Sequence, residues 1–144
     1  MKMTLNEVRV RLSNLTSVSE RNRKPVSEKR IPVKLSISIG KNIINLESEL
    51  KLLENERKKL VETYAKKDEN GKAVIENNEY KMDDMDSFKE EFEELLKEEI
   101  DVDIRTVPMS IIENYDDSKY DVLTPEDIVV IDFMIVEDGG LKHE

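Results

Sequence analysis

The sequence predicts an α+β protein that is mainly helical, with a long antiparallel helical hairpin, a small antiparallel β element and a C-terminal helix. Apolar residues recur at steps of three and four over 39–64 and again over 85–96, which is the spacing of one helix face. Asn70-Gly71 separates the two stripes, and this pair adopts the positive φ values of a tight turn. Two long helices joined by a chain reversal form an antiparallel hairpin.

The chain length suits one domain with its own core, because 144 residues can bury a large share of their apolar surface. Charged residues make up 39% of the chain and aromatic residues 5%, a composition typical of long solvated helices. We predict a single domain, 1–144, with four consecutive parts: an N-terminal helix and basic loop (1–30), a helical hairpin with a β tip (31–99), a strand and the C-terminal helix (100–136), and a tail (137–144).

The first helix is predicted from Thr4-Leu5-Asn6-Glu7. This is a capping box, in which the threonine oxygen accepts a backbone N–H and the glutamate reaches back to the cap. The segment 20–30 is polar, basic and interrupted by Pro25, so we predict a loop there. The apolar face of the helix comprises Leu5, Val8, Leu12 and Leu15.

The long helix carries a heptad seam, which is typical of helices that pack along their length. Leu52 and Val61 widen this apolar stripe. Apolar and polar residues alternate over 31–39, which fits a strand as well as a helix; we prefer a helix that begins at about Pro32. The seam consists of Ile39, Ile43, Leu46, Leu50, Leu53, Leu60 and Tyr64, with Arg57 in the remaining place.

A β hairpin and a second helix follow. The segments 73–75 and 80–82 are short and apolar, and the polar residues 76–79 join them, so they predict a small hairpin between the two helices. The second helix is predicted to begin near Asp83. Its stripe comprises Met85, Phe88, Phe92, Leu95 and Leu96.

The C-terminal part is predicted as a half-buried strand followed by a helix. Alternating apolar residues run from Ile100 to Val107, which is strand periodicity. Thr124-Pro125 is a helix start, because threonine caps well and proline suits the first helical position. The run 128–135 is apolar on most sides, so we expect it to be buried against the hairpin and a second surface. Together with the heptad seam, it predicts a homo-oligomer.

Several function classes find no support in the sequence. The chain contains no cysteine, which removes disulfides, thiolate nucleophiles and cysteine metal sites and fits a reducing compartment. No apolar run approaches the roughly 20 residues of a membrane-spanning helix. His143, the one histidine, lies in the terminal tail, and the turn at Asp68 lacks the ligand spacing of a calcium loop. We predict no enzymatic activity, no metal and no cofactor.

Charge is divided between the two parts of the chain. Residues 1–67 contain sixteen Lys/Arg and eight Asp/Glu, whereas residues 68–144 contain seven and twenty-five. The acidic part is interpreted either as a solvated face or as a surface that imitates nucleic acid and occupies a basic groove of a partner. The candidate residues of this surface are Glu90, Glu91, Glu94, Glu98, Asp101 and Asp103.

The basic loop is the second candidate site, and three interpretations remain open. It is a connector that neutralises the acidic part of the same or a neighbouring subunit, a phosphate site for a small nucleotide, or a contact to duplex nucleic acid. The last is disfavoured by the net charge of −10. The candidate residues are Arg21, Arg23, Lys24, Lys29, Arg30 and Lys34.

The order of these features resembles a family of small phage and prophage proteins of unknown function, over about residues 31–136. The features are Ile31-Pro32-Val33-Lys34 before the long helix, Asp68-Glu69-Asn70-Gly71-Lys72 after it, Phe92-Glu93-Glu94-Leu95-Leu96 leading into 99–104, and Leu123-Thr124-Pro125 before the last helix. The resemblance implies a viral origin and a place in the cytoplasm of a bacterial host. It brings no activity or catalytic residue.

Three functional hypotheses follow. The first is a non-enzymatic phage accessory protein that inhibits a host process, such as an antiviral defence system, by binding a host protein through its acidic surface. The second is an oligomeric sponge that sequesters an anionic signalling nucleotide with the basic loop. The third is a structural or assembly role in the virion, based on a similarity of shape to prefoldin-like chaperones.

Overall fold

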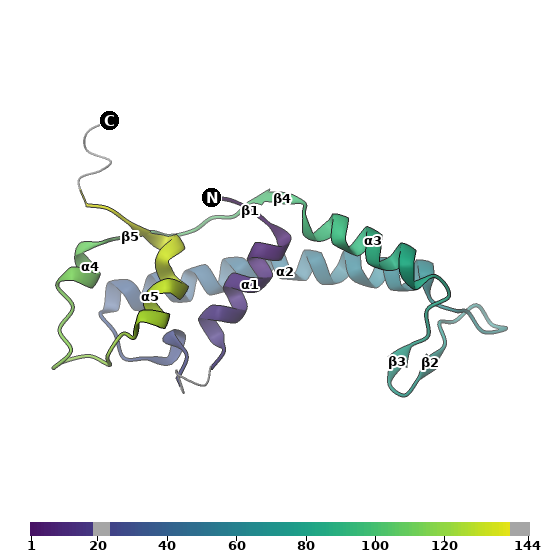
Figure 1. Ribbon diagram of the computed structural model, residues 1–144, viewed down its shortest axis with the longest axis horizontal. Coiled ribbons are helices and arrows are strands. Elements are labelled where there is room, and N and C mark those ends of the chain that lie inside the picture. Colours follow the sequence, from purple (N-terminus) through teal and green to yellow (C-terminus); the bar gives the residue numbers. More distant parts are fainter. Residues whose placement is uncertain (19–23, 139–144) are drawn as a thin grey trace.

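The computed structural model describes residues 1–18 and 24–138 and shows an elongated molecule built along one helix (Figure 1). This helix, α2 (Val33–Tyr64), has 32 residues. Its N-terminal half belongs to a packed body, and its C-terminal half projects as an arm (Figure 1). The other elements are β1 (Lys2–Thr4), α1 (Leu5–Thr16), η1 (Val26–Glu28), β2 (Ile75–Glu76), β3 (Glu79–Tyr80), α3 (Met85–Leu96), β4 (Glu99–Asp101), β5 (Val107–Pro108), α4 (Ser110–Glu113), α5 (Pro125–Ile131), η2 (Asp132–Met134) and β6 (Ile135–Val136).

The predicted mainly helical α+β fold is confirmed, including the helix after Pro32. Leu35 and Ile39 lie four residues apart on one face of α2 and are buried, whereas Val33 and Ile37 lie on the opposite face and are exposed. Alternation in sequence therefore reflects two opposite helix faces rather than the two faces of a strand. The capping box at Thr4 is also present, with Thr4 Oγ1 accepting the Glu7 N–H at 3.1 Å.

The core surrounds the N-terminal half of α2. It is formed by α1, α2, η1, α5, η2 and the extended segment between β4 and β5. No residue of α3 is buried, and the buried members of this core include no residue of α2 beyond Leu46, so the core ends before the arm. The fully buried apolar members are Met3, Val8, Leu15, Val26, Ile31, Leu35, Ile39, Leu46, Val102, Val107, Ile131 and Met134.

The heptad seam of α2 faces the chain's own elements. Ile39, Leu46 and Leu53 are buried within the described chain, so these three residues are not free to form an interface with another subunit. Leu52 does not widen the seam as predicted, because its position turns it away from the core and leaves it 57% exposed. An interface between copies must therefore use side chains other than these three.

Two asparagines of α2 hold the extended segment that follows β4. The buried side chain of Asn42 donates from Nδ2 to the Arg105 carbonyl at 2.9 Å and accepts the Arg105 N–H at Oδ1 at 2.7 Å. One helical turn later, Asn45 Nδ2 donates to the Asp103 carbonyl at 2.8 Å. These carboxamides satisfy backbone groups that a neighbouring strand would otherwise satisfy.

The predicted strand from Ile100 to Val107 is therefore two short strands with different partners. β4 pairs antiparallel with β1, with Met3 opposite Ile100. β5 pairs in parallel with β6, with Val107 opposite Ile135. The predicted alternation of burial is present over 100–105, where Ile100, Val102 and Ile104 are buried or half-buried and the residues after each of them are exposed.

The predicted C-terminal helix is shorter than expected. Thr124 caps α5 as predicted, but the α-helix ends at Ile131, and 132–134 form a 3₁₀ turn before β6. Pairing with β5 draws residues 135–136 into an extended conformation, and the Met109 N–H donates to the Val136 carbonyl at 2.7 Å. Ile128 and Val129 are exposed rather than buried between two surfaces.

The arm consists of the C-terminal half of α2, α3 and a β tip at the far end (Figure 1). The tip is the predicted hairpin, with β2 and β3 antiparallel and both turn residues, Asn77 and Asn78, at positive φ. The preceding turn places Gly71 at φ +78°, a conformation that glycine adopts without strain. Phe88 and Phe92 stack along α3 with ring centroids 5.9 Å apart.

Replacing Asn42 with alanine should destabilise the protein by about 2–3 kcal/mol, because it leaves the backbone N–H and C=O of Arg105 without their partner. Asn45→Ala is the matched control, since it removes one exposed hydrogen bond from the same segment and should cost about 1 kcal/mol or less. Urea unfolding followed by circular dichroism measures both. Equal losses for the two variants would contradict the role given to Asn42.

Candidate functional site

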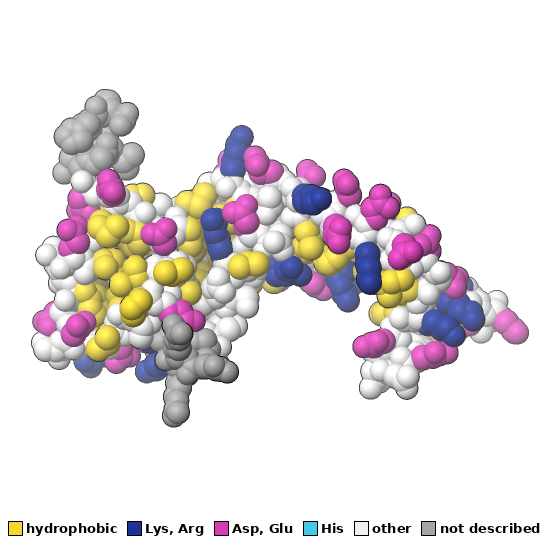
Figure 2. All heavy atoms as spheres, in the orientation of Figure 1, with side chains coloured by type: hydrophobic (Ala, Val, Ile, Leu, Met, Phe, Trp, Pro, Cys, Tyr) yellow, Lys and Arg dark blue, Asp and Glu magenta, His cyan; other side chains and the backbone are white. Residues whose placement is uncertain are grey.

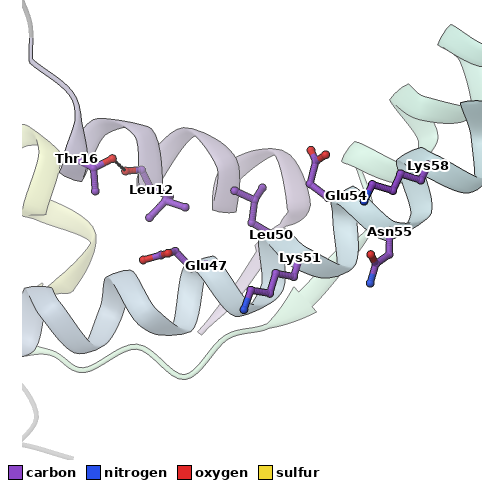
Figure 3. A pocket seen from close by; sticks show the side chains of 8 residues that line it. All are labelled: Leu12, Thr16, Glu47, Leu50, Lys51, Glu54, Asn55 and Lys58. Atoms are coloured by element: carbon purple, nitrogen blue, oxygen red, sulfur yellow. Dashed lines mark hydrogen bonds between the residues drawn. The ribbon is translucent and has the colours of Figure 1, made fainter. Parts of the chain in front are cut away.

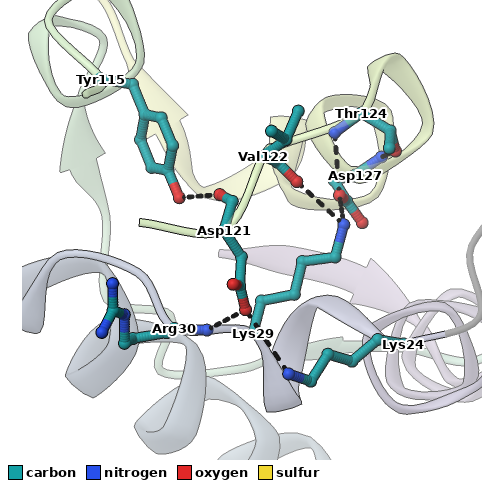
Figure 4. A network of polar contacts seen from close by, with 8 residues as sticks. All are labelled: Lys24, Lys29, Arg30, Tyr115, Asp121, Val122, Thr124 and Asp127. Atoms are coloured by element: carbon teal, nitrogen blue, oxygen red, sulfur yellow. Dashed lines mark hydrogen bonds and ion pairs between the residues drawn. The ribbon is translucent and has the colours of Figure 1, made fainter. Parts of the chain in front are cut away.

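The basic residues that follow the N-terminal loop pack against the C-terminal part of the chain (Figure 4). Lys29 forms an ion pair with Asp127, and their side chains are 8% and 2% exposed. Lys29 Nζ also donates to the Val122 carbonyl at 3.1 Å. The Asp127 carboxylate in turn accepts the Thr124 N–H at 2.9 Å, as part of the cap of α5. The Lys29 side chain therefore forms a buried contact that links the N-terminal and C-terminal parts of the chain.

Asp121 makes a second contact of the same kind. Its carboxylate accepts the Arg30 N–H at 2.8 Å and lies 3.5 Å from Lys24 Nζ, and its own N–H donates to the Arg30 carbonyl at 2.8 Å. The hydrogen bond from the Arg30 backbone and the charge of Lys24 lower the pKa of Asp121. Burial and the nearby Asp121 charge raise the pKa of Tyr115 to about 12, and the Tyr115 hydroxyl donates to the Asp121 carbonyl.

The basic residues that were predicted to bind phosphate do not form one cluster in the described chain. Lys24 and Lys29 contact carboxylates, and the Arg30 guanidinium donates to the Lys119 carbonyl. Lys34 lies on α2 and is exposed. Arg21 and Arg23 lie outside the described residues. Of the three interpretations of the basic loop, these contacts favour the connector that neutralises acidic groups of the same chain.

The predicted acidic residues lie on α3 and on the segment after it. Glu90, Glu91 and Glu94 belong to α3 and are exposed, as is Glu98 just beyond it. The amino group of Met1 donates to Asp101 Oδ1 at 2.9 Å and lowers the pKa of that carboxyl. Asp103 is exposed, with its backbone carbonyl held by Asn45. The acidic surface is thus concentrated on α3.

The carboxylates of α3 fall into two rows. Asp86, Glu90 and Glu93 recur at steps of four and three, so they share one side of the helix, next to the apolar stripe at Glu93 and further from it at Glu90. Acidic side chains accordingly line the outer edge of the arm (Figure 2). Within residues 1–18 and 24–138, none of the three lies within ion-pair distance of a basic group. We call these three residues the outer acidic row.

The second row consists of Glu91 and Glu94, and a groove runs along it between α3 and α2. It has a volume of about 360 Å³ and is lined by Glu56, Leu60, Glu91, Glu94 and Leu95. Interaction with the Glu91 carboxylate raises the pKa of Tyr64 on α2. This arm groove therefore has an apolar floor between carboxylates. Leu60 and Leu95 were predicted to pack between the two helices of the hairpin. They are only half-buried there, and nothing in the sequence indicates this.

A second groove separates α1 from α2 (Figure 3). It has a volume of about 610 Å³, and Leu12 and Leu50 face each other across it. Its charged side chains alternate in sign along α2, so it favours neither an anion nor a cation. Both leucines were expected in the core, which is why sequence analysis missed this groove. Its lining comprises Leu12, Thr16, Glu47, Leu50, Lys51, Glu54, Asn55 and Lys58.

Over 1–18 and 24–138, no three His, Cys, Asp or Glu side chains gather in an arrangement that could hold a metal ion. No described helix is both long and apolar enough to cross a membrane. His143 lies outside the described residues.

Comparison of the chain with protein-family models, curated proteins and solved structures found no match. The class is therefore defined by the structure itself: a mainly helical α+β protein with a two-helix arm that projects from a small body (Figure 1). The resemblance to phage proteins remains a prediction.

Replacing Lys29 with methionine should destabilise the protein by about 3 kcal/mol, because Asp127 then stays buried without its cation. Lys34→Met removes the same charge from an exposed position and should change the free energy of unfolding by less than about 0.5 kcal/mol. Urea unfolding at neutral pH compares the two variants. If Lys29→Met proved as mild as Lys34→Met, the pair would not be a structural contact.

Asp121 should make folding sensitive to acid. Its pKa is lower in the folded than in the unfolded chain, so its contribution is present above the unfolded value of about 4 and is lost as pH falls through the folded value. Asp121→Asn should therefore reduce the steepness with which unfolding free energy falls below about pH 4. Urea titrations from neutral to acid pH measure this slope. An unchanged slope would contradict the prediction.

Proposed function

We propose that this chain is a non-enzymatic phage or prophage accessory protein. It inhibits an antiviral defence system of the bacterial host by binding a host protein in the cytoplasm. The outer acidic row is the observation that supports a binding role. Its carboxylates lie on a projecting helix and have no basic partner in the described chain. A row of carboxylates without ion-pair partners attracts a basic groove, and it does so over a distance set by the ionic strength.

The shape of the arm supports the same proposal. α3 presents its carboxylates along the edge of the molecule, away from the body that contains the core (Figure 2). Glu93 lies at the body end of this row, beside Thr4 and Asn6, so a basic cleft that receives the whole row also reaches the edge of the body. Charge complementarity of this kind contributes chiefly to association rate and to specificity.

We further propose that copies of the chain associate with one another. Exposed apolar side chains on α2, among them Ile37 and Ile44, support this part of the proposal, because apolar surface is stabilised by burial. The nucleotide sponge has less support, since Lys24, Lys29 and Arg30 already contact groups within the chain.

Reversing charge on the outer acidic row should abolish inhibition. In a host with an active defence system that the wild-type chain suppresses, Glu90→Lys/Glu93→Lys should lower phage plating towards the level without the protein. Glu113→Lys/Glu137→Lys is the matched control, with the same charge change at two exposed positions of the body. With a purified defence protein, affinity should fall at least about tenfold for the first variant only.

Equal inhibition by wild-type chain and by Glu90→Lys/Glu93→Lys would contradict the acidic-surface proposal. Loss of inhibition in both variants would also contradict it, because general electrostatics rather than this row would then be responsible. Circular dichroism on each variant establishes that the fold is retained.

A further inference from the structure

The N-terminal half of α2 carries an apolar stripe on the face opposite the core. Val33, Ile37 and Ile44 are 73%, 47% and 63% exposed. Their steps of four and seven residues place them on one helix face. Gly40 lies between them on the same face, and a Cβ atom added there would meet nothing within 4 Å. We call these residues the outer stripe; it is open along its whole length.

The outer stripe has a basic flank. Lys34 and Lys41 lie seven residues apart, so they project along one side of it. Both are exposed, and neither forms an ion pair within residues 1–18 and 24–138. The stripe therefore offers apolar contact bordered by positive charge.

The arm groove has the opposite charge. Leu60 and Leu95 form its apolar part, and Glu56, Glu91 and Glu94 border it. Leu52 lies one helical turn from Glu56 on the same flank of α2 and is mostly exposed, so it extends the apolar surface beyond the groove. The groove therefore fits an apolar helix face with basic residues beside it.

These two surfaces cannot meet within one chain. Residues 33–44 and 52–60 belong to the same continuous helix (Figure 1), and a straight α-helix holds residues eight positions apart about 12 Å from each other. Contact between the surfaces therefore requires two molecules.

We propose that the arm groove of one copy binds the outer stripe of a second copy. The inference specifies the self-association proposed above and rests on it. Apolar residues of the stripe cover Leu52, Leu60 and Leu95, while Lys34 and Lys41 approach the carboxylates of the groove. The contact is heterologous, since the two copies contribute different surfaces. Each added copy leaves one free groove and one free stripe, so the assembly lengthens with concentration unless it closes into a ring.

Sedimentation velocity with two variants tests this arrangement. Glu91→Lys/Glu94→Lys reverses the charge of two of the three carboxylates that border the groove and keeps the stripe. Ile37→Gln/Ile44→Gln removes the stripe and keeps the groove. Each variant alone should associate at least about tenfold more weakly than the wild-type chain. An equimolar mixture of the two should form a one-to-one dimer that does not lengthen, because only one complementary pair of surfaces remains.

Val10→Gln/Val129→Gln is the matched control, because it makes two other exposed apolar positions polar and should associate as the wild-type chain does. Added salt should weaken wild-type association, since the charged border is solvent-exposed. A wild-type chain that stays monomeric at the highest attainable concentration would overturn the inference. So would a mixture of the two variants that stays monomeric, or a control that is weakened equally.

The outcome is separable from that of the proposed host interaction. The variants Glu91→Lys/Glu94→Lys and Glu90→Lys/Glu93→Lys change different rows of α3. A monomeric wild-type chain that still inhibits through Glu90 and Glu93 would overturn self-association, and the inference with it, and would leave the host-binding proposal standing. Association that both variants leave unchanged would overturn the inference alone. Association as described, with inhibition unaffected by Glu90→Lys/Glu93→Lys, would overturn the host-binding proposal alone.

Discussion

The contact between the Asn42 carboxamide and the backbone of Arg105 determines how the rest of the chain is arranged. It fixes an extended segment against a helix, using both the N–H and the C=O of one residue. Because the segment is held in the middle, its two ends reach different partners, β1 at one end and β6 at the other. The N-terminal and C-terminal parts of the chain are thereby brought to the same body. A strand in that place would need a neighbouring strand, and α2 supplies asparagine side chains instead.

The charge division of the sequence has two different structural outcomes. In the body, basic residues near position 30 meet carboxylates more than ninety positions later, through Lys29 with Asp127 and Arg30 with Asp121. Positive charge from the first part of the chain is thus used to attach the last part. In the arm, the carboxylates of α3 find no such partners in the described chain. Folding therefore neutralises one acidic region and leaves the other charged, which is a physical basis for assigning binding to the arm.

Sequence reasoning succeeded where structure is local. The capping threonines Thr4 and Thr124, the helix after Pro32 and the hairpin near 75–80 depend on residues a few positions apart. It failed where the outcome depends on distant partners. No sequence pattern near Ile135 indicates its pairing with Val107. Likewise, no pattern near Lys29 indicates that it forms an ion pair with a buried carboxylate at position 127. The arm groove could not be predicted either, because the same leucine pattern describes a covered seam and a half-covered one.

The placement of the core along only half of α2 divides one helix between two environments. Around Leu35 and Leu46, opening the helix would expose fully buried side chains, so backbone amides there can exchange with solvent only when the body unfolds. Beyond Leu53, the partner helix α3 has no buried residue, and only Val61 and Ala65 are buried at the end of α2, so fewer buried contacts hold the arm than hold the body. A continuous helix thus joins two units of different local stability. We therefore expect the amides of the arm to exchange with solvent sooner than those of the body.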